Sequence, residues 1–205
     1  FRRFAESPHL GGLRELGLSG YRFGPVAAGH LAGAAWLANV RTLDFSTNAI
    51  GDDGAEALAE SPHVANLTAW ELGSNDITDR GLIALCRSPH LARLSTLHVG
   101  SNRFTAEGTR TIPTATFANS LKSINLSACN LDADAVAALA NGAFPALTAL
   151  DVSYNAGGDG VRALVAAPFF RALEVFRAGS NETGTAIVDA IVSAGFVPLR
   201  ELALG

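Results

Sequence analysis

The sequence predicts an α/β solenoid, in which short parallel strands form one sheet and a helix carries the chain back to the start of each next strand. Three observations indicate this fold. The line L-x-x-L-x-V-x-x-N-x-F, which begins at Leu94, recurs along the chain. Its copies begin 26 or 27 residues apart, and a helical pattern follows each copy. Since all strands then run the same way, the crossovers are right-handed and the sheet curves into a horseshoe arc, concave on the strand side and convex on the helix side.

The regular spacing predicts a single domain over residues 1–205, with about eight repeats. A strand is expected at each start, because apolar residues alternate there with polar ones. The predicted strands start near Leu13, Val40, Leu67, Leu94, Leu121, Leu147, Leu173 and Leu199. The central inward-facing column is Leu16, Leu43, Trp70, Leu97, Ile124, Leu150, Phe176 and Leu202.

One polar column follows the strands, at the turn that leads into each helix. Such a turn leaves backbone groups without strand partners, and an inward-pointing carboxamide satisfies them from one repeat to the next. We therefore predict a buried structural ladder, with cysteine as a weaker substitute in one repeat and Tyr21 in place of the polar residue in the first. The ladder consists of Asn48, Asn75, Asn102, Cys129, Asn155 and Asn181.

The helices should begin at acidic or hydroxyl residues, which suit the positive end of the helix dipole. Pro113 should end the fourth of these helices early. Within the helices, one position holds only small residues, so we expect the helix to lie closest to the sheet there and Gly81→Ala to be tolerated. That column is Ala27, Gly54, Gly81, Gly108, Ala135, Gly160 and Ala186.

The histidines and cysteines are predicted to be structural. His63 and His90 share a column with phenylalanines and a tryptophan, which favours packed rings over metal ligands. Cys86 and Cys129 fall at different places in the repeat, so we expect two buried thiols and no disulfide. The histidine column is His9, Trp36, His63, His90, Phe117, Phe144, Phe170 and Phe196.

Composition excludes several classes of partner. The net charge of −4 comes from 15 basic and 19 acidic residues spread along the chain, without the basic stripe that nucleic acid requires. No apolar run is long enough to span a bilayer. We therefore predict no nucleic acid, no membrane, no metal and no cofactor. The absence of a visible leader and the two unpaired cysteines favour the cytoplasm without determining the compartment.

Both ends of the sequence fall within a repeat. Phe1–Glu6 has the pattern of a helix end, and Leu199–Leu204 has that of a strand. Because an unpaired strand edge invites association, we expect the chain to be a segment of a longer protein, or to self-associate end to end.

The repeated line, its asparagine column and its one helix per repeat resemble the leucine-rich repeat family over the whole chain. The long repeats and the Asn or Cys at the turn resemble its ribonuclease-inhibitor-like subclass, in a bacterial-type tandem array. This resemblance implies a non-catalytic scaffold that binds another protein, of unknown identity, through the concave face. The binding residues that register places on that face are Arg41, Asp44, Glu71, His98, Lys122, Asn125, Asp151, Tyr154 and Arg177.

Three alternatives to this interpretation stay open. The polar face can simply keep an exposed sheet soluble, with the repeats acting as a structural spacer in a longer protein. Glu71, His98 and Asp151 could form an enzyme or metal site, although an open sheet gives little of the shelter that catalysis needs. A regulatory role like that of GTPase activators occurs in some relatives of the subclass, but no residue here matches a motif for it.

Overall fold

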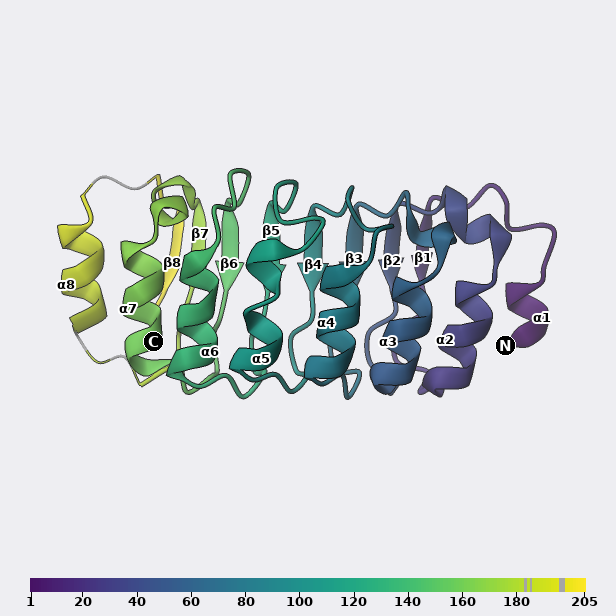
Figure 1. The fold of residues 1–205 in the computed structure, drawn as a ribbon, viewed down its shortest axis with the longest axis horizontal. Coiled ribbons are helices and arrows are strands. Elements are labelled where there is room, and N and C mark those ends of the chain that lie inside the picture. Colours follow the sequence, from purple (N-terminus) through teal and green to yellow (C-terminus); the bar gives the residue numbers. More distant parts are fainter. Residues whose placement is uncertain (183, 185, 196–197) are drawn as a thin grey trace.

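The computed structural model describes residues 1–182, 184, 186–195 and 198–205. It has the predicted architecture: eight strands form one parallel sheet in chain order, and the helices pack in a layer along one side of it (Figure 1). The strands are β1 (Glu15–Gly17), β2 (Thr42–Asp44), β3 (Ala69–Glu71), β4 (Thr96–His98), β5 (Ser123–Asn125), β6 (Ala149–Asp151), β7 (Val175–Arg177) and β8 (Glu201–Ala203).

The helices alternate with the strands. The α-helices are α1 (Arg2–Ala5), α2 (Gly24–Ala32), α3 (Gly51–Ala59), α4 (Asp79–Arg87), α5 (Ala106–Thr109), α6 (Ala133–Ala138), α7 (Gly158–Ala166) and α8 (Ala186–Ser193). Short 3-10 helices lead to five of the strands: η1 (Ala35–Asn39), η2 (Pro62–Val64), η3 (Ile112–Thr114), η4 (Leu139–Asn141) and η5 (Pro168–Ala172). As predicted, the fourth full helix ends early, because Pro113 lies just after α5 and cannot continue it.

The predicted register is confirmed from strand to strand. Leu43 of β2 pairs with Leu16 on one side and with Trp70 on the other, and the same alignment continues to β8. The paired strands begin two residues after the predicted starts, at Glu15 instead of near Leu13. The difference arises because the first apolar residue of each line closes the preceding turn. An example is the 2.9 Å bond from the Leu67 N–H to the carbonyl oxygen of Val64.

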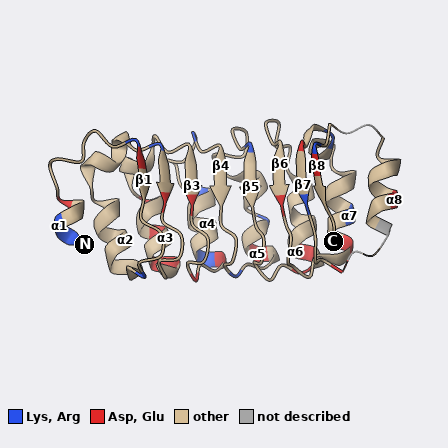
Figure 2. Ribbon diagram, turned by 180° about the vertical axis from the view of Figure 1, so that it is seen from behind, with Lys and Arg blue, Asp and Glu red and all other residues tan. Residues whose placement is uncertain are grey.

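The sheet has one covered and one open face. From β2 to β7 the middle residue of each strand is buried, while the first and third residues are half-exposed. Figure 2 shows the strands in front of the helices from this side. We call the surface formed by the first and third strand residues the open sheet face.

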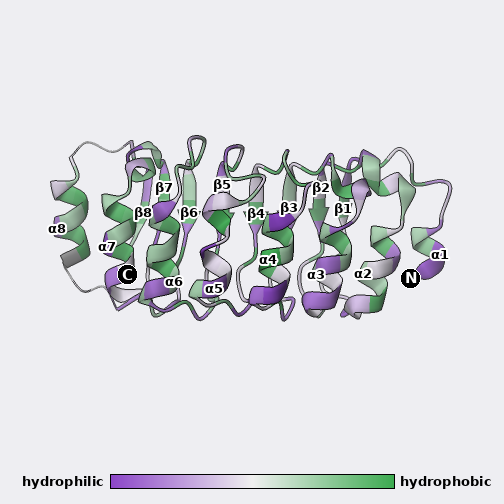
Figure 3. Ribbon diagram, viewed as in Figure 1, coloured by the Kyte–Doolittle hydropathy of each residue, from purple (hydrophilic) through white to green (hydrophobic). Residues whose placement is uncertain are grey.

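The core lies between the sheet and the helices. Figure 3 shows apolar colour on the helix bodies, mixed colour on the strands, and hydrophilic colour at the lower ends of α3, α4 and α6, where those helices begin. The middle strand residues and the apolar helix residues together form the buried cluster. In the described part of the chain, no helix is long and apolar enough to cross a bilayer.

The predicted asparagine ladder is present and buried. The amide nitrogen of Asn75 donates to the carbonyl oxygens of Phe45 and Leu72 at 2.9 and 3.0 Å. Its amide oxygen accepts the backbone N–H groups of Asn48 and Ile50 at 3.0 and 3.4 Å. The first of these carbonyl groups and both of these N–H groups belong to the previous repeat. Asn48, Asn102, Asn155 and Asn181 make equivalent bonds.

A second ladder joins the starts of neighbouring helices. The carboxylate of Asp52 accepts the backbone N–H groups of Thr78 and Gly81 at 2.8 and 2.9 Å, and the Thr78 hydroxyl at 2.6 Å. Asp79 makes the same bonds to Thr105 one repeat later. Burial would raise the pKa of Asp52, but the hydrogen bonds and the charge of Arg80 outweigh it, and the net shift is downward.

The small-residue column contacts a different neighbour from the one predicted. A methyl group at Gly81 would lie 2.7 Å from the Asp52 carboxylate and 3.1 Å from the Ala55 methyl, both on the preceding helix α3. The prediction that the helix is closest to the sheet at this column is therefore wrong: small residues allow helix to pack on helix. The side chain of Ala186 lies outside the described residues.

The histidine column is also less uniform than predicted. His63 and His90 are half-exposed, and the following residues, Val64 and Leu91, fill the core in their place. In later repeats the phenylalanines themselves are buried, at Phe117, Phe144 and Phe170. Phe196 lies outside the described residues. Histidine and phenylalanine are thus equivalent in sequence but not in burial.

Both cysteines are buried and unpaired, as predicted. Burial raises the pKa of each thiol to about 12, against smaller opposing effects of nearby hydrogen bonds. At neutral pH both are therefore thiols with little nucleophilic character.

Candidate functional site

Six of the predicted binding residues form one polar row along the open sheet face. Strand pairing aligns the third residues of β2 to β7, and all of them are half-exposed. Neighbouring strands lie about 4.8 Å apart, so adjacent side chains in the row are within reach of one another. The row consists of Asp44, Glu71, His98, Asn125, Asp151 and Arg177.

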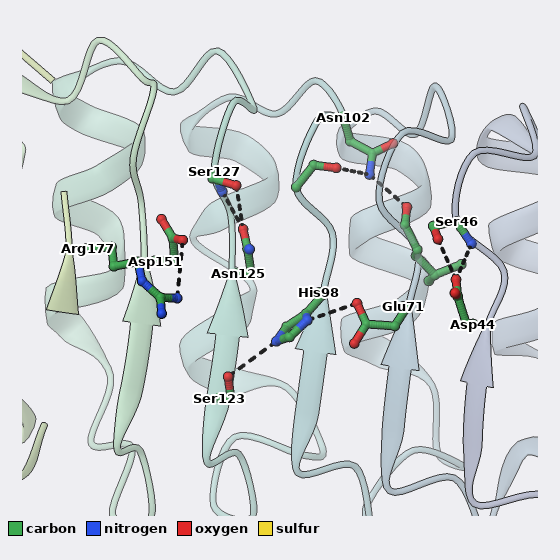
Figure 4. Close-up of polar contacts among 12 residues, drawn as sticks. Asp44, Ser46, Glu71, His98, Asn102, Ser123, Asn125, Ser127, Asp151 and Arg177 are labelled. Carbon is green, nitrogen blue, oxygen red and sulfur yellow. Dashed lines mark hydrogen bonds and ion pairs between the residues drawn. The ribbon is translucent and has the colours of Figure 1, made fainter. Parts of the chain in front are cut away.

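Three members of the row cap their own turns. The carboxylate of Asp44 accepts the backbone N–H of Ser46 at 3.0 Å and also its hydroxyl (Figure 4). Asn125 and Asp151 accept the N–H groups of the serines two residues after them, at 2.8 and 2.9 Å. Asp44 and Asp151 therefore hold the turns that follow their strands as well as contributing charge to the open sheet face.

Glu71 and His98 form a different arrangement with a third residue. The Glu71 carboxylate lies 2.8 Å from Nδ1 of His98, and Nε2 of His98 lies 3.3 Å from the hydroxyl of Ser123 (Figure 4). The predicted trio of Glu71, His98 and Asp151 is thus only partly brought together. Ser123 was missed because it belongs to the first residues of the strands, not to the row, and reaches His98 diagonally.

Arg177 ends the row in a network of ion pairs. Its guanidinium group makes two bonds to the Glu201 carboxylate, at 2.5 and 2.9 Å, and lies 3.8 Å from Asp151. Hydrogen bonding to Glu201 is the main cause that raises the pKa of Arg177. The charges of Arg177 and Asp151 are therefore largely compensated by ion pairs within the protein.

The remaining predicted residues lie at the borders of the open sheet face. Arg41 and Lys122 immediately precede β2 and β5, and both are exposed. Tyr154 follows β6 in the turn and is 70% exposed. Arg41 and Lys122 thus stand where β2 and β5 begin, while β2, β3 and β6 end in acidic residues, which Figure 2 shows in red.

A shallow depression of about 90 Å³ opens in this face beside Ser123. Its floor is low because Ala149 and Val175 occupy the positions that pair in line with Ser123. His98, Asn125, Asp151 and Arg177 also line it. A larger hollow of about 590 Å³ lies at the N-terminal end of the array, between the α1 region and α2. None of the predicted binding residues lines it.

Metal binding has no site of the usual kind in the described residues, since no three His, Cys, Asp or Glu side chains converge there. The chemistry that the open sheet face offers is hydrogen bonding, charge, and the one carboxylate–imidazole–hydroxyl array.

Comparison with known proteins supports the repeat assignment. A model of the leucine-rich repeat family matches residues 37–59 and 65–86. Among curated proteins, no sequence matches the chain.

The fold is similar to that of an internalin from Listeria monocytogenes, with a TM-score of 0.58 and 20% sequence identity. The match covers 96% of this chain and 55% of the internalin chain, so the chain spans about half the length of that protein. At this identity the likeness concerns the fold alone. The matched repeats, the register and the parallel sheet agree, so the chain has the leucine-rich repeat fold, and two of its repeats match the family model.

Proposed function

We propose that this protein is a scaffold that binds another protein through the open sheet face. Leucine-rich repeat proteins generally bind other proteins. The observation that carries the proposal is the aligned row of half-exposed polar side chains from β2 to β7, which the helices leave uncovered. Such a row presents several contacts at fixed spacing to one partner.

The distribution of charge indicates the kind of partner. Arg41 and Lys122 are exposed at the strand starts, and no hydrogen bond within the described residues engages their side chains. Glu71 lies near the strand ends, with a side chain that is 36% exposed. A partner with acidic groups facing the strand starts and a basic group facing Glu71 would be oriented by these charges. Electrostatic complementarity of this kind acts mainly on the association rate.

The test compares two sets of three charge reversals. The sheet set is Arg41→Glu, Glu71→Lys and Lys122→Glu, which leaves the turn caps intact. The helix set is Glu60→Lys, Arg87→Glu and Arg110→Glu, at exposed positions on the opposite side of the molecule. Both sets change the net charge by the same amount, so a general charge effect is matched.

Affinity capture is performed with the parent and with both variant sets, and the association rate of each captured protein is then measured at low and high salt. We expect that the parent and the helix set capture one or more proteins that the sheet set fails to retain. Their association with the sheet set should slow at low salt, where charge steering is strongest. If both sets capture the same proteins equally fast, the open sheet face is not the binding surface and a spacer role is favoured.

A further inference from the structure

We propose that Ser123 is an activated nucleophile that reacts with small acyl esters, with His98 as its general base and Glu71 as the residue that positions His98. This activity goes beyond binding, and it runs against the prediction that the protein is non-catalytic. It rests on three side chains from three neighbouring strands, β3, β4 and β5, that meet on the open sheet face.

The order of the three groups determines the direction of the hydrogen bonds. An ionised carboxylate only accepts hydrogen bonds, so at 2.8 Å from Glu71 the Nδ1 atom of His98 must carry a proton. In the neutral ring Nε2 is then the basic nitrogen, and it faces the Ser123 hydroxyl at 3.3 Å. This is the tautomer that a serine nucleophile requires, and the distance is within the range of such pairs before substrate binds.

Strand pairing holds the array in place. Glu71 pairs with His98 in the register of β3 and β4, and Ser123 pairs with Thr96, two residues before His98. The Ser123 hydroxyl has no hydrogen-bond partner other than His98 among the described residues. The histidine side chain is 33% exposed, so the ring is partly sheltered yet open to a small molecule.

Asn125 offers a donor for the oxygen that becomes negative during the reaction. Its amide oxygen already accepts the N–H and the hydroxyl of Ser127, at 2.8 and 2.7 Å, which fixes the orientation of the amide. Ser123 and Asn125 line the same depression, roughly 6.6 Å apart along β5, so the Asn125 NH2 group is the nearby amide donor for an oxygen on the carbon that Ser123 attacks.

The depression beside Ser123 limits the substrate. Its volume is about 90 Å³, and Ala149 and Val175 make part of its lining apolar. A space of this size suits a short acyl chain such as acetyl and does not suit a long fatty acyl chain.

The chemical step needs only an ester and water. The Ser123 oxygen forms a bond to the ester carbonyl carbon while its proton moves to Nε2 of His98. The bond to the leaving alcohol oxygen then breaks, and that oxygen takes the proton from His98. Water, deprotonated by the same nitrogen, later attacks the acyl carbon. The bond from that carbon to the Ser123 oxygen then breaks, and this oxygen takes the proton from His98, which releases the carboxylic acid and free Ser123.

The test uses 4-nitrophenyl acetate with the intact chain, and follows both nitrophenolate release and the mass of the protein. We expect rapid release of one equivalent with one acetyl group mapped to Ser123. The variant Ser123→Ala should slow release at least about tenfold, and His98→Gln should do the same, because general-base assistance contributes about 10²–10⁴-fold. The matched control is Ser95→Ala. Ser95 is half-exposed immediately before β4, its hydroxyl donates to the backbone oxygen of Thr68, and no hydrogen bond within the described residues joins it to a histidine.

The variant Glu71→Gln tests whether Glu71 positions His98 for the reaction or only stabilises the fold. Because Glu71 orients the His98 ring and does not contact the ester, its removal should slow the acylation step while the KM for 4-nitrophenyl acetate stays unchanged. Urea midpoints equal to that of the parent show that the variants are folded. If Ser123 is acetylated no faster than Ser95, or if Ser123→Ala reacts like the parent, the proposal is wrong. Either result leaves the scaffold proposal unaffected, because affinity capture by the sheet and helix variant sets does not depend on ester hydrolysis.

Discussion

One buried carboxamide in each repeat satisfies backbone groups that no strand can pair, and Asn75 is the clearest example. Its side chain is completely buried and bonds to backbone groups of two repeats. We expect Asn75→Ala to lower the free energy of unfolding by about 1–3 kcal/mol, because each buried group left unpaired carries a desolvation cost. Urea unfolding measures this.

Thr68→Ala is the control, because Thr68 lies at the border of the open sheet face, is not buried, and its hydroxyl makes one hydrogen bond, to the backbone oxygen of Arg41. Equal unfolding midpoints for the two variants would show that the carboxamide ladder does not stabilise the fold.

The sequence predicts such ladder residues well, because a polar side chain that recurs inside an apolar pattern is buried and must find hydrogen-bond partners there. It predicted the polar row as a column but not the role of each member. A signal was present: serine follows two residues after Asp44, Asn125 and Asp151, the residues that cap turns. Glycine stands there after Glu71 and His98, which leaves those two side chains free to contact each other.

The turns contain a further feature that the residue types conceal. The residue just before each ladder position has a positive φ, between 54° and 57°, although it is not glycine in most repeats. These residues are Thr47, Ser74, Ser101, Ala128, Tyr154 and Ser180. Their left-handed backbone is imposed by the hydrogen bonds of the turn, so side-chain preference alone could not predict it. Tyr154 owes its exposure to this position.

At the scale of elements, the starts of neighbouring helices fit too closely for an added methyl group. Alanine at Gly81 would place its methyl group 2.6 Å from Ile77 and 2.7 Å from the Asp52 oxygen that bonds the Gly81 N–H. We expect Gly81→Ala to destabilise the protein by about 1–3 kcal/mol through overpacking, despite the better helix propensity of alanine. Thermal or urea unfolding checks the sign.

Gly29→Ala is the matched control. Gly29 lies inside α2, and nothing is within 4 Å of a methyl group there, so this variant should gain up to about 1 kcal/mol. If both variants are equally stabilised, the helix starts have room to adjust and the close contact at Gly81 is unimportant.

The same ladder makes part of the stability depend on pH. The pKa of Asp52 is lowered in the folded protein, so its contribution is complete above the ordinary carboxyl pKa and is lost as the pH falls through the lower folded value. Asp52→Asn keeps the shape but removes the charge. It should cost about 1 kcal/mol at pH 7, and this cost should shrink below about pH 4.

Unfolding midpoints of Asp52→Asn and of the parent, measured from pH 7 down to pH 3, test this prediction. Asp53→Asn serves as the reference, because the Asp53 side chain is 73% exposed and accepts no backbone N–H. A difference between Asp52→Asn and the parent that stays constant with pH would contradict it.

Periodicity predicted the order of strands and helices and their register because each element must bury one apolar side against the same core. Periodicity could not predict which residues the small side chains contact. A column of small residues shows that space is limited at that position but does not show which element limits it. The short 3-10 helices were missed for a related reason: they depend on the path between layers, which the apolar pattern does not encode.

At the scale of the whole molecule, two irregularities coincide near the middle of the array. Helix α5 is only Ala106–Thr109, and Cys129 replaces the ladder asparagine in the next repeat. The Cys129 sulfur lies 3.3 Å from the carbonyl oxygen of Val99, a weak substitute for an amide donor, and offers no amide oxygen to the backbone of Asn102. In repeat arrays, stability is a sum over repeats and the contacts between neighbours. The junction between β4 and β5 therefore lacks the carboxamide bonds that join the other neighbouring strands from β1 to β7.

This weakness predicts that the two parts of the array unfold separately, and that Cys129→Asn joins them. Both tryptophans, Trp36 and Trp70, lie before the junction, so their fluorescence reports the first part, whereas circular dichroism reports the whole chain. In the parent, the two signals should give different urea midpoints. In Cys129→Asn, restored hydrogen bonds to Val99 and Asn102 should add about 1 kcal/mol and bring the midpoints together.

Cys129→Ser distinguishes this effect from a simple change in polarity, because a hydroxyl group is small and cannot bridge two repeats as a carboxamide does. We expect the serine variant to keep separate midpoints and to gain no stability. Hydrogen exchange adds an independent measure, since the asparagine variant should slow exchange of the β4 and β5 amides relative to the parent. A Cys129→Asn protein that unfolds at lower urea than the parent, or with midpoints as far apart, would show that the cysteine is not where the coupling between repeats is lost.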